Sequence, residues 1–102
     1  MRLTEDQVLA ITQIVSRLAG ETAETYLFGS RLDDGAQGGD VDLLIETDNP
    51  LTLIDRARIK IELETRLQLP VDILAKARSA PPTPFQAIAY QTAGKLGKGK
   101  LP

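Results

Sequence analysis

The chain has 102 residues, of which 42% are hydrophobic, and its formal net charge is −2. That length suffices for one compact domain, and the hydrophobic content predicts a globular rather than a disordered chain. Because the chain contains no cysteine and no histidine, disulfides, zinc sites of those residues, thiol nucleophiles and histidine bases are excluded. Any catalysis must therefore use carboxylates, hydroxyls, basic side chains or a metal held by oxygen ligands.

Charge and hydropathy also bear on partners and location. The acidic net charge argues against general nucleic-acid binding, which needs a basic face, although Lys95, Lys98 and Lys100 gather near the C-terminus. No apolar run approaches the ~20 residues that a membrane span needs. The N-terminus has no apolar signal core, so we expect a cytoplasmic protein.

The first predicted element is a helix over residues 4–19. Thr4 and Gln7 match a capping box, and Gly20 is typical of a helix C-terminus. The apolar residues of this helix recur at helical spacing: Val8, Ile11, Val15 and Leu18.

A short strand over residues 24–28, a glycine-rich loop over 29–39 and a second strand over 40–46 are predicted next. Because side chains alternate along a strand, the second strand has two faces. One face carries Val41, Leu43 and Ile45, and the other carries Asp40, Asp42, Leu44 and Glu46.

After a turn at residues 48–50, a second helix is predicted over 51–67, ended by Pro70. Its apolar residues on one face are Leu53, Ile54, Ala57 and Ile61. A third strand follows at 71–74. A last helix opens at Pro84, capped by Thr83 and Gln86, with Phe85, Ile88 and Ala89 toward the core.

The order α-β-β-α-β-α with short loops predicts a small α/β (α+β) domain, in which a mixed sheet is flanked by helices. We expect this domain to span residues 1–93. Glycines at positions 94, 97 and 99 predict a flexible basic tail over residues 94–102.

The loop after the first strand has the composition of a phosphate site. Gly29 lets a ligand approach the backbone closely, and the N–H groups of Gly29 and Ser30, with the Ser30 hydroxyl, can donate to phosphate oxygens. Arg31 is placed to contact the same phosphates or a neighbouring acid. Taken alone, a Gly-Ser pair is ordinary turn chemistry.

Three carboxylates stand within apolar strands that have no structural need of them. Asp40 and Asp42 lie on one strand face, roughly 6.5–7 Å apart along the chain. Asp72 lies between Val71 and Ile73, and would join them if the third strand lies beside the second. Carboxylates are the hard oxygen ligands that Mg²⁺ prefers. Alone, the Asp40–Asp42 pair could be a solvated strand edge or a turn, and Asp72 could cap a strand or pair with Lys76. The ordered combination favours a metal–phosphate site.

The segments Leu27–Arg31 and Gly39–Glu46 together resemble the nucleotidyltransferase domain of the DNA polymerase beta superfamily, and most closely its minimal (MNT) branch. The resemblance implies nucleotide binding by Gly29, Ser30, Arg31 and Gly39, and metal binding and catalysis by Asp40, Asp42 and Asp72. It also implies transfer of a nucleoside monophosphate, usually AMP from ATP, to a hydroxyl with one or two Mg²⁺ ions. The minimal proteins are commonly paired with a HEPN-domain toxin, for which they act as antitoxins.

Two hypotheses follow. In the first, the chain is an active Mg²⁺-dependent enzyme that modifies a HEPN-domain partner. In the second, it is a weak or inactive binding module that neutralises its partner by occlusion, because Asp33 and Asp34 stand where many relatives have a basic residue. Action on RNA ends or on an antibiotic hydroxyl is a weaker third reading. The acceptor, the preferred base and the oligomeric state, including homo-oligomers, are left open by the sequence.

Overall fold

The computed structural model describes residues 3–28, 41–84, 86–88 and 94–96. Its elements are α1 (Glu5–Ala19), β1 (Glu24–Phe28), β2 (Val41–Thr47), α2 (Leu53–Leu67), β3 (Val71–Ala77) and β4 (Gly94–Leu96). The predicted phosphate loop at 29–39 and Asp40 lie outside the described residues. No helix in the described ranges is long and apolar enough to cross a membrane.

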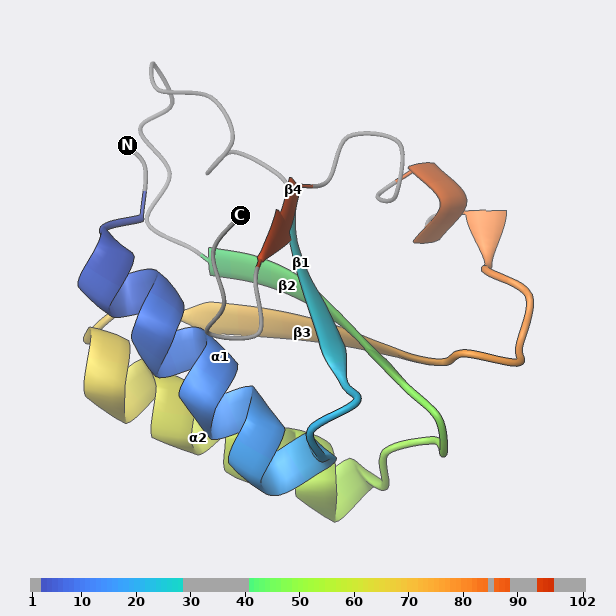
Figure 1. Ribbon diagram of the computed structural model, residues 1–102, viewed down its shortest axis with the longest axis horizontal. Helices are drawn as coiled ribbons and strands as arrows, with labels where there is room; N and C mark the ends of the chain where they lie inside the picture. Colours follow the sequence, from blue (N-terminus) through green and yellow to red (C-terminus); the bar gives the residue numbers. More distant parts are fainter. Residues whose placement is uncertain (1–2, 29–40, 85, 89–93, 97–102) are drawn as a thin grey trace.

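The strands form one mixed sheet with the order β3-β2-β1-β4 (Figure 1). β1 pairs antiparallel with both β2 and β4, and β2 pairs parallel with β3. α1 and α2 lie together on one face of this sheet (Figure 1). The predicted fold class is therefore confirmed, and the third predicted strand does lie beside the second.

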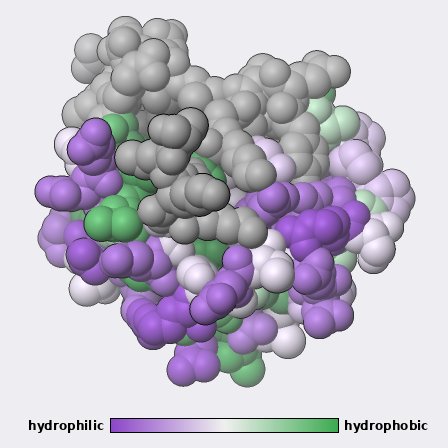
Figure 2. Space-filling model, in the orientation of Figure 1, coloured by the Kyte–Doolittle hydropathy of each residue, from purple (hydrophilic) through white to green (hydrophobic). Residues whose placement is uncertain are grey.

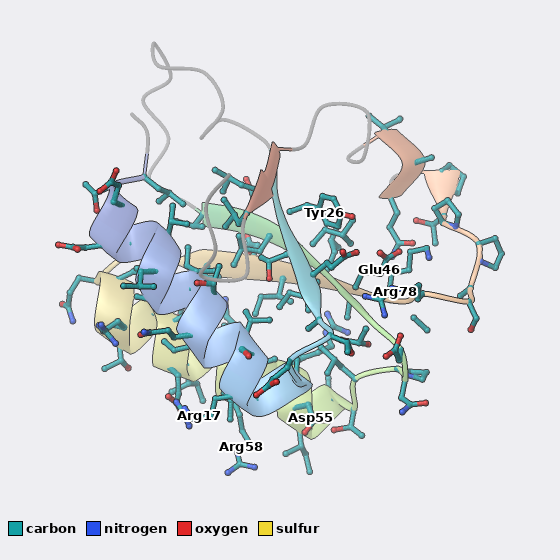
Figure 3. All side chains as sticks on the ribbon, viewed as in Figure 1. Arg17, Tyr26, Glu46, Asp55, Arg58 and Arg78 are labelled. Carbon is teal, nitrogen blue, oxygen red and sulfur yellow. The ribbon has the colours of Figure 1, made fainter. Side chains whose placement is uncertain are left out.

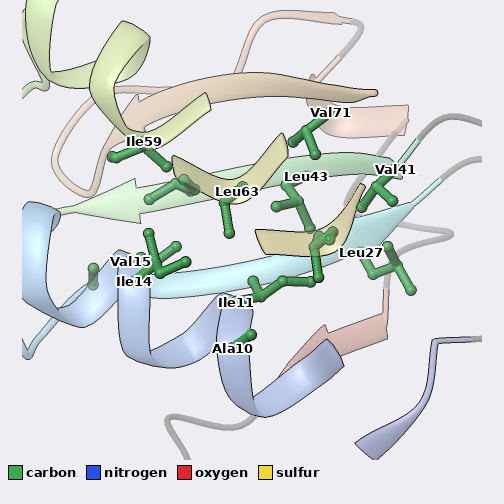
Figure 4. Packing of buried hydrophobic residues seen from close by; sticks show 13 residues of the cluster. Ala10, Ile11, Ile14, Val15, Leu27, Val41, Leu43, Ile59, Leu63 and Val71 are labelled. Atoms are coloured by element: carbon green, nitrogen blue, oxygen red, sulfur yellow. The ribbon is translucent and has the colours of Figure 1, made fainter. Parts of the chain in front are cut away.

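The hydrophobic core fills the space between the two helices and the sheet (Figure 4). Its fully buried side chains include Ile11 and Val15 from α1, and Ile59 and Leu63 from α2. The sheet contributes Val41, Leu43, Ile45 and Val71, which are all 0% exposed. The predicted division of β2 into two faces is thus confirmed, because its odd-numbered residues enter the core.

α1 ends where the sequence predicts and begins at Glu5, one residue after the predicted start, because Thr4 is its N-cap. The Thr4 hydroxyl accepts a hydrogen bond from the Gln7 N–H at 3.1 Å, and the Gln7 side chain accepts one from the Thr4 N–H at 2.8 Å. Gly20 ends the helix with a φ of 103°, which glycine adopts without strain. The buried face is Ala10, Ile11, Ile14 and Val15, so the predicted Val8 and Leu18 lie only at its margins.

α2 differs from its prediction in its first residue and in the face that it packs against the sheet. It begins at Leu53 rather than 51, because Thr52 and Asp55 form a capping box, and it ends at Leu67, ahead of Pro70. The residues that pack on the sheet are Ile59, Leu63 and Leu67. The predicted apolar face points to solvent instead: Leu53, Ile54, Ala57 and Ile61 are all exposed.

The C-terminal part requires three corrections. β3 extends to Ala77, three residues beyond its predicted end. Thr83 and Gln86 do form the predicted cap, but Ile88 is 61% exposed instead of facing the core, and Phe85 and Ala89 lie outside the described residues. Residues 94–96, predicted as flexible tail, form β4, because pairing with β1 satisfies backbone groups that Gly94 and its neighbours could not satisfy alone.

The sheet face turned away from the helices carries a charge cluster (Figure 3). The cluster lies at the C-terminal ends of β2 and β3 and the N-terminal end of β1. Lys76 of β3 is 9% exposed and its ammonium lies 3.3 Å from Glu46 Oε2 of β2. Arg78 pairs with Asp48 and lies 3.7 Å from Glu24 and 3.9 Å from Glu46. Burial opposes the charge on Arg78, but the hydrogen bond to Asp48 and the three carboxylates outweigh it, so the Arg78 pKa is raised.

Candidate functional site

Asp42 and Asp72 are direct neighbours across two parallel strands. The register pairs Val41 with Val71 and Asp42 with Asp72. Adjacent strands lie about 4.8 Å apart, so the two aspartate backbones stand side by side. Because Val41 and Val71 both enter the core, alternation turns both aspartates away from the core, and Asp72, on the edge strand, still lies within 4.0 Å of Lys60 of α2.

The end of β1 reaches the same place. Phe28, the last residue of β1, is the pairing partner of Asp42. The chain continues from Phe28 directly into Gly29 and Ser30, which lie outside the described residues together with Arg31, Gly39 and Asp40. Among the described residues no group of three or more acidic side chains is close enough to hold a metal ion, so the described part contributes two of the three predicted carboxylates.

The two described aspartates differ in their surroundings. Asp42 is half-buried in the second strand of the sheet, whereas the Asp72 side chain is 67% exposed on the edge strand. Lys60 of α2 brings its ammonium to 4.0 Å from Asp72 Oδ1. Asp72 is therefore accessible to a ligand from solvent, and the Lys60 ammonium lies next to its carboxylate.

Lys60 belongs to a link that fixes the start of β3 to α2. Its ammonium donates to the Val71 carbonyl and to Glu64 Oε2, the latter at 3.1 Å. The same Glu64 oxygen accepts the Val71 N–H at 2.8 Å. These contacts satisfy both outward backbone groups of Val71, the residue that precedes Asp72, and so hold the edge strand in position.

Glu64 should make the stability of this link depend on pH. The Val71 N–H and then Lys60 lower the pKa of the Glu64 carboxyl below its usual range. A carboxylate of lowered pKa stabilises the fold above its unfolded-state pKa and loses that effect as the pH falls. We expect Glu64→Gln to lower the Tm at pH 7, and the difference from wild type to shrink below about pH 4.

Thermal melts across this pH range measure the effect. Glu21→Gln provides the matched control, because Glu21 is exposed and no described residue pairs with it, and it should melt as wild type at every pH. Equal Tm values for Glu64→Gln and wild type at pH 7 would contradict the assigned role.

A groove of about 310 Å³ lies between α2 and the edge strand β3. Its lining residues are Leu53, Arg56, Ala57, Lys60, Asp72 and Ile73. Arg56 spans it by donating to the Ile73 carbonyl at 3.3 Å. From the sequence alone, Arg56 and Lys60 could either supply positive charge or form a solvated basic face, and the second reading is the more usual one. Their spacing of one helical turn shows that they share a side, but only the packing of α2 reveals that this side borders Asp72.

A family model described as a nucleotidyltransferase domain matches residues 9–93. The chain belongs to this nucleotidyltransferase family. The predicted domain class is thereby confirmed, and the match spans the described strands that carry Asp42 and Asp72. No curated protein matches the sequence.

Several solved structures share the nucleotidyltransferase fold. One is a tri-AMPylated HEPN toxin in complex with its MNT antitoxin from Shewanella oneidensis, with 19% identity, a TM-score of 0.72, and coverage of 93% of this chain and 72% of that chain. A toxin–antitoxin structure with AMP-PNP has 22% identity and a TM-score of 0.71, covering 93% and 73%. A mutant of the toxin–antitoxin MntA–HpeT has 21% identity and a TM-score of 0.69, with the same coverage.

The donor set of this nucleotidyltransferase suits a hard divalent cation. Asp42 and Asp72 offer carboxylate oxygens from adjacent strands, and the described residues include no sulfur or imidazole ligand nearby that would favour a softer metal. Asp42 and Asp72, with Asp40 two residues before Asp42 in the sequence, are the residues that would hold Mg²⁺. When bound, Mg²⁺ would neutralise phosphate charge beside these acids.

Proposed function

We propose that this nucleotidyltransferase transfers AMP from Mg²⁺-ATP to a hydroxyl of a HEPN-domain partner protein and thereby acts as an antitoxin. The observation that carries the proposal is the in-register pair of Asp42 and Asp72 in a chain of the nucleotidyltransferase family. The AMPylated HEPN toxin and the AMP-PNP complex among the structures of the same fold support the nucleotide and the partner class.

Each acid has a distinct task in this proposal. Asp42, half-buried next to the end of β1, binds on the nucleotide side, close to the Gly29–Ser30 turn that the sequence assigns to the phosphates. Asp72, exposed on the edge strand, faces the acceptor and takes the proton from the attacking hydroxyl at a carboxylate oxygen. The hydroxyl oxygen then bonds to the α-phosphorus of ATP, and pyrophosphate leaves.

Binding of Mg²⁺-ATP is expected to raise the Tm of the isolated chain. A ligand at 100 times its Kd stabilises the folded state by about 2.7 kcal/mol, which in a domain of this size corresponds to a rise of at least about 10 °C. Thermal melts with ATP and Mg²⁺, ATP with EDTA, and Mg²⁺ alone measure it. A Tm that stays flat at millimolar Mg²⁺-ATP would contradict the nucleotide site.

A second function, neutralisation by occlusion without transfer, is favoured by Asp33 and Asp34, which place two negative charges in the predicted phosphate loop. Incubation with labelled ATP, Mg²⁺ and the product of the adjacent gene, which is expected to be a HEPN-domain protein, separates the two. Label on the partner supports the transferase. Neutralisation without label, and unchanged in Asp42→Asn, supports occlusion.

A further inference from the structure

Helix α2 has two apolar faces, and the core uses only one of them. Ile59, Leu63 and Leu67 pack on the sheet. On a different side of the helix, Leu53 is 78% exposed, Ile54 70% and Ile61 62%. We call Leu53, Ile54, Ala57 and Ile61 the α2 stripe. Figure 2 shows a small apolar patch at the bottom of the molecule, where α2 starts in Figure 1. Exposed apolar residues grouped in this way are typical of a surface that binds a partner.

The α2 stripe borders the groove that contains Asp72. Leu53 and Ala57 belong to both the stripe and the groove lining. Leu53, Ala57 and Ile61 recur every four residues, and the small Ala57 stands at the centre of the row. A row with this spacing and a small central residue lets another helix pack closely against it.

The groove itself attracts negative charge. Arg56 contacts the Ile73 carbonyl and, like Arg58 and Arg66, has no carboxylate partner among the described residues, whereas Arg17, Lys60, Lys76 and Arg78 all pair with one. An arginine held against a backbone carbonyl keeps further N–H donors for a carboxylate. Of Arg56, Arg58 and Arg66, Arg56 is the one that lines the groove beside the α2 stripe.

The edge of β3 does not favour an added strand. The outward carbonyls of Val71, Ile73 and Ala75 already accept hydrogen bonds from Lys60, Arg56 and Gln86. The outward N–H of Val71 donates to Glu64. These contacts make the edge less available to an added strand and favour an occupant that binds through side chains, as a helix does.

We propose that the α2 stripe and the groove bind a helix of the partner protein that carries the acceptor hydroxyl. Apolar side chains of this helix pack on the row of Leu53, Ala57 and Ile61, and one of its carboxylates pairs with Arg56. Since Asp72 lines the same groove, a hydroxyl carried next to that helix is delivered to the acid that activates it. This inference rests on the proposed function, because it supplies the acceptor half of the same reaction.

Charge reversal tests the docking surface. The probe is the purified product of the gene adjacent to that of this chain, which is expected to be a HEPN-domain protein, and its affinity is measured by calorimetry. Arg56→Glu should weaken binding at least about tenfold, and Ile61→Ser should weaken it as well. Arg66→Glu is the matched control, because Arg66 is exposed on the opposite side of α2, and it should bind within about twofold of wild type. All three positions are exposed, so the fold is expected to persist, and circular dichroism checks it.

Site-specific cross-linking gives a second measurement, since the chain has no cysteine of its own. A photo-cross-linker on Ile54→Cys should capture the HEPN-domain protein, whereas the same group on Gln13→Cys of α1 should not. Unchanged affinity in Arg56→Glu, no binding by wild type, or cross-links only between copies of this chain would overturn the proposal. The Mg²⁺-ATP melt is read in parallel: if it fails while Arg56→Glu still weakens binding, the proposed transfer is wrong and the docking surface stands.

Discussion

Replacing Asp42 or Asp72 with asparagine is expected to reduce AMP transfer on the order of 10³-fold while leaving the fold intact. Asparagine has the same shape as aspartate, but it carries no negative charge and cannot accept the proton of a hydroxyl. Loss of one preorganised electrostatic group at a reaction centre costs about 10²–10³ in rate, and loss of the proton acceptor adds to it. The measurement is label transfer from ATP to the HEPN-domain partner at saturating Mg²⁺.

The two variants should differ in nucleotide binding. Asp42 lies half-buried beside the end of β1, so Asp42→Asn should also lose most of the stabilisation by Mg²⁺-ATP. Asp72 lies exposed on the edge strand, so Asp72→Asn should keep more of that stabilisation while losing transfer. This difference separates a residue that binds the donor from one that acts on the acceptor.

Asp6→Asn is the matched control, because Asp6 is an exposed carboxylate in the first turn of α1 with no ion-pair partner among the described residues. It should transfer AMP at the wild-type rate. Transfer by Asp42→Asn at the wild-type rate would exclude the proposed site. If wild type and both variants all neutralise the partner equally without label, the occlusion mechanism is favoured.

Alternation along the strands made much of this site predictable. In β2, apolar residues at every second position identify the core face, and so place Asp42 on the other face. The partner of Asp42 was not predictable in the same way. Whether Asp72 lies opposite Asp42 or two residues away depends on the register between β2 and β3, which no local sequence pattern specifies.

The orientation of α2 shows where sequence periodicity fails. Its two apolar rows, one with Leu53 and Ile61 and one with Ile59 and Leu63, both fit helical spacing. The links from α2 to the edge of β3, through Lys60 and Glu64, accompany the packing of the second row on the sheet. Because these contacts are tertiary, no local pattern could select between the rows. β4 is similar, since its three residues gain their order from β1.

The buried ion pair between Lys76 and Glu46 is the strongest electrostatic contact expected on the far side of the sheet. The Lys76 side chain is 7% exposed and that of Glu46 is 14% exposed, with 3.3 Å between Nζ and Oε2. Lys76 also donates to the carbonyls of Ala77 at 2.9 Å and Arg78 at 3.3 Å. All three donors of the ammonium are therefore used within the protein.

Lys76→Met is expected to destabilise the fold by about 3 kcal/mol. Removal of one partner leaves the other charge poorly solvated, and for buried pairs this costs about 3–5 kcal/mol. Arg78, 3.9 Å from Glu46, still compensates part of the charge, so the effect should fall at the lower end. Urea denaturation measures the free energy of unfolding, and the Tm should fall by at least about 10 °C.

A double-mutant cycle with Glu46→Gln isolates the pair. In Lys76→Met the Glu46 carboxylate is left buried without its partner. Because Glu46→Gln replaces that carboxylate with a neutral amide, adding it to Lys76→Met should recover part of the lost stability. Arg17→Met is the exposed control: Arg17 pairs with Glu62 at the surface, with side chains 58% and 41% exposed, and should cost less than about 1 kcal/mol. If Lys76→Met cost no more than Arg17→Met, the cluster would be a solvated surface feature, and the stability of the far face would have to come from its apolar residues, such as Leu44, instead.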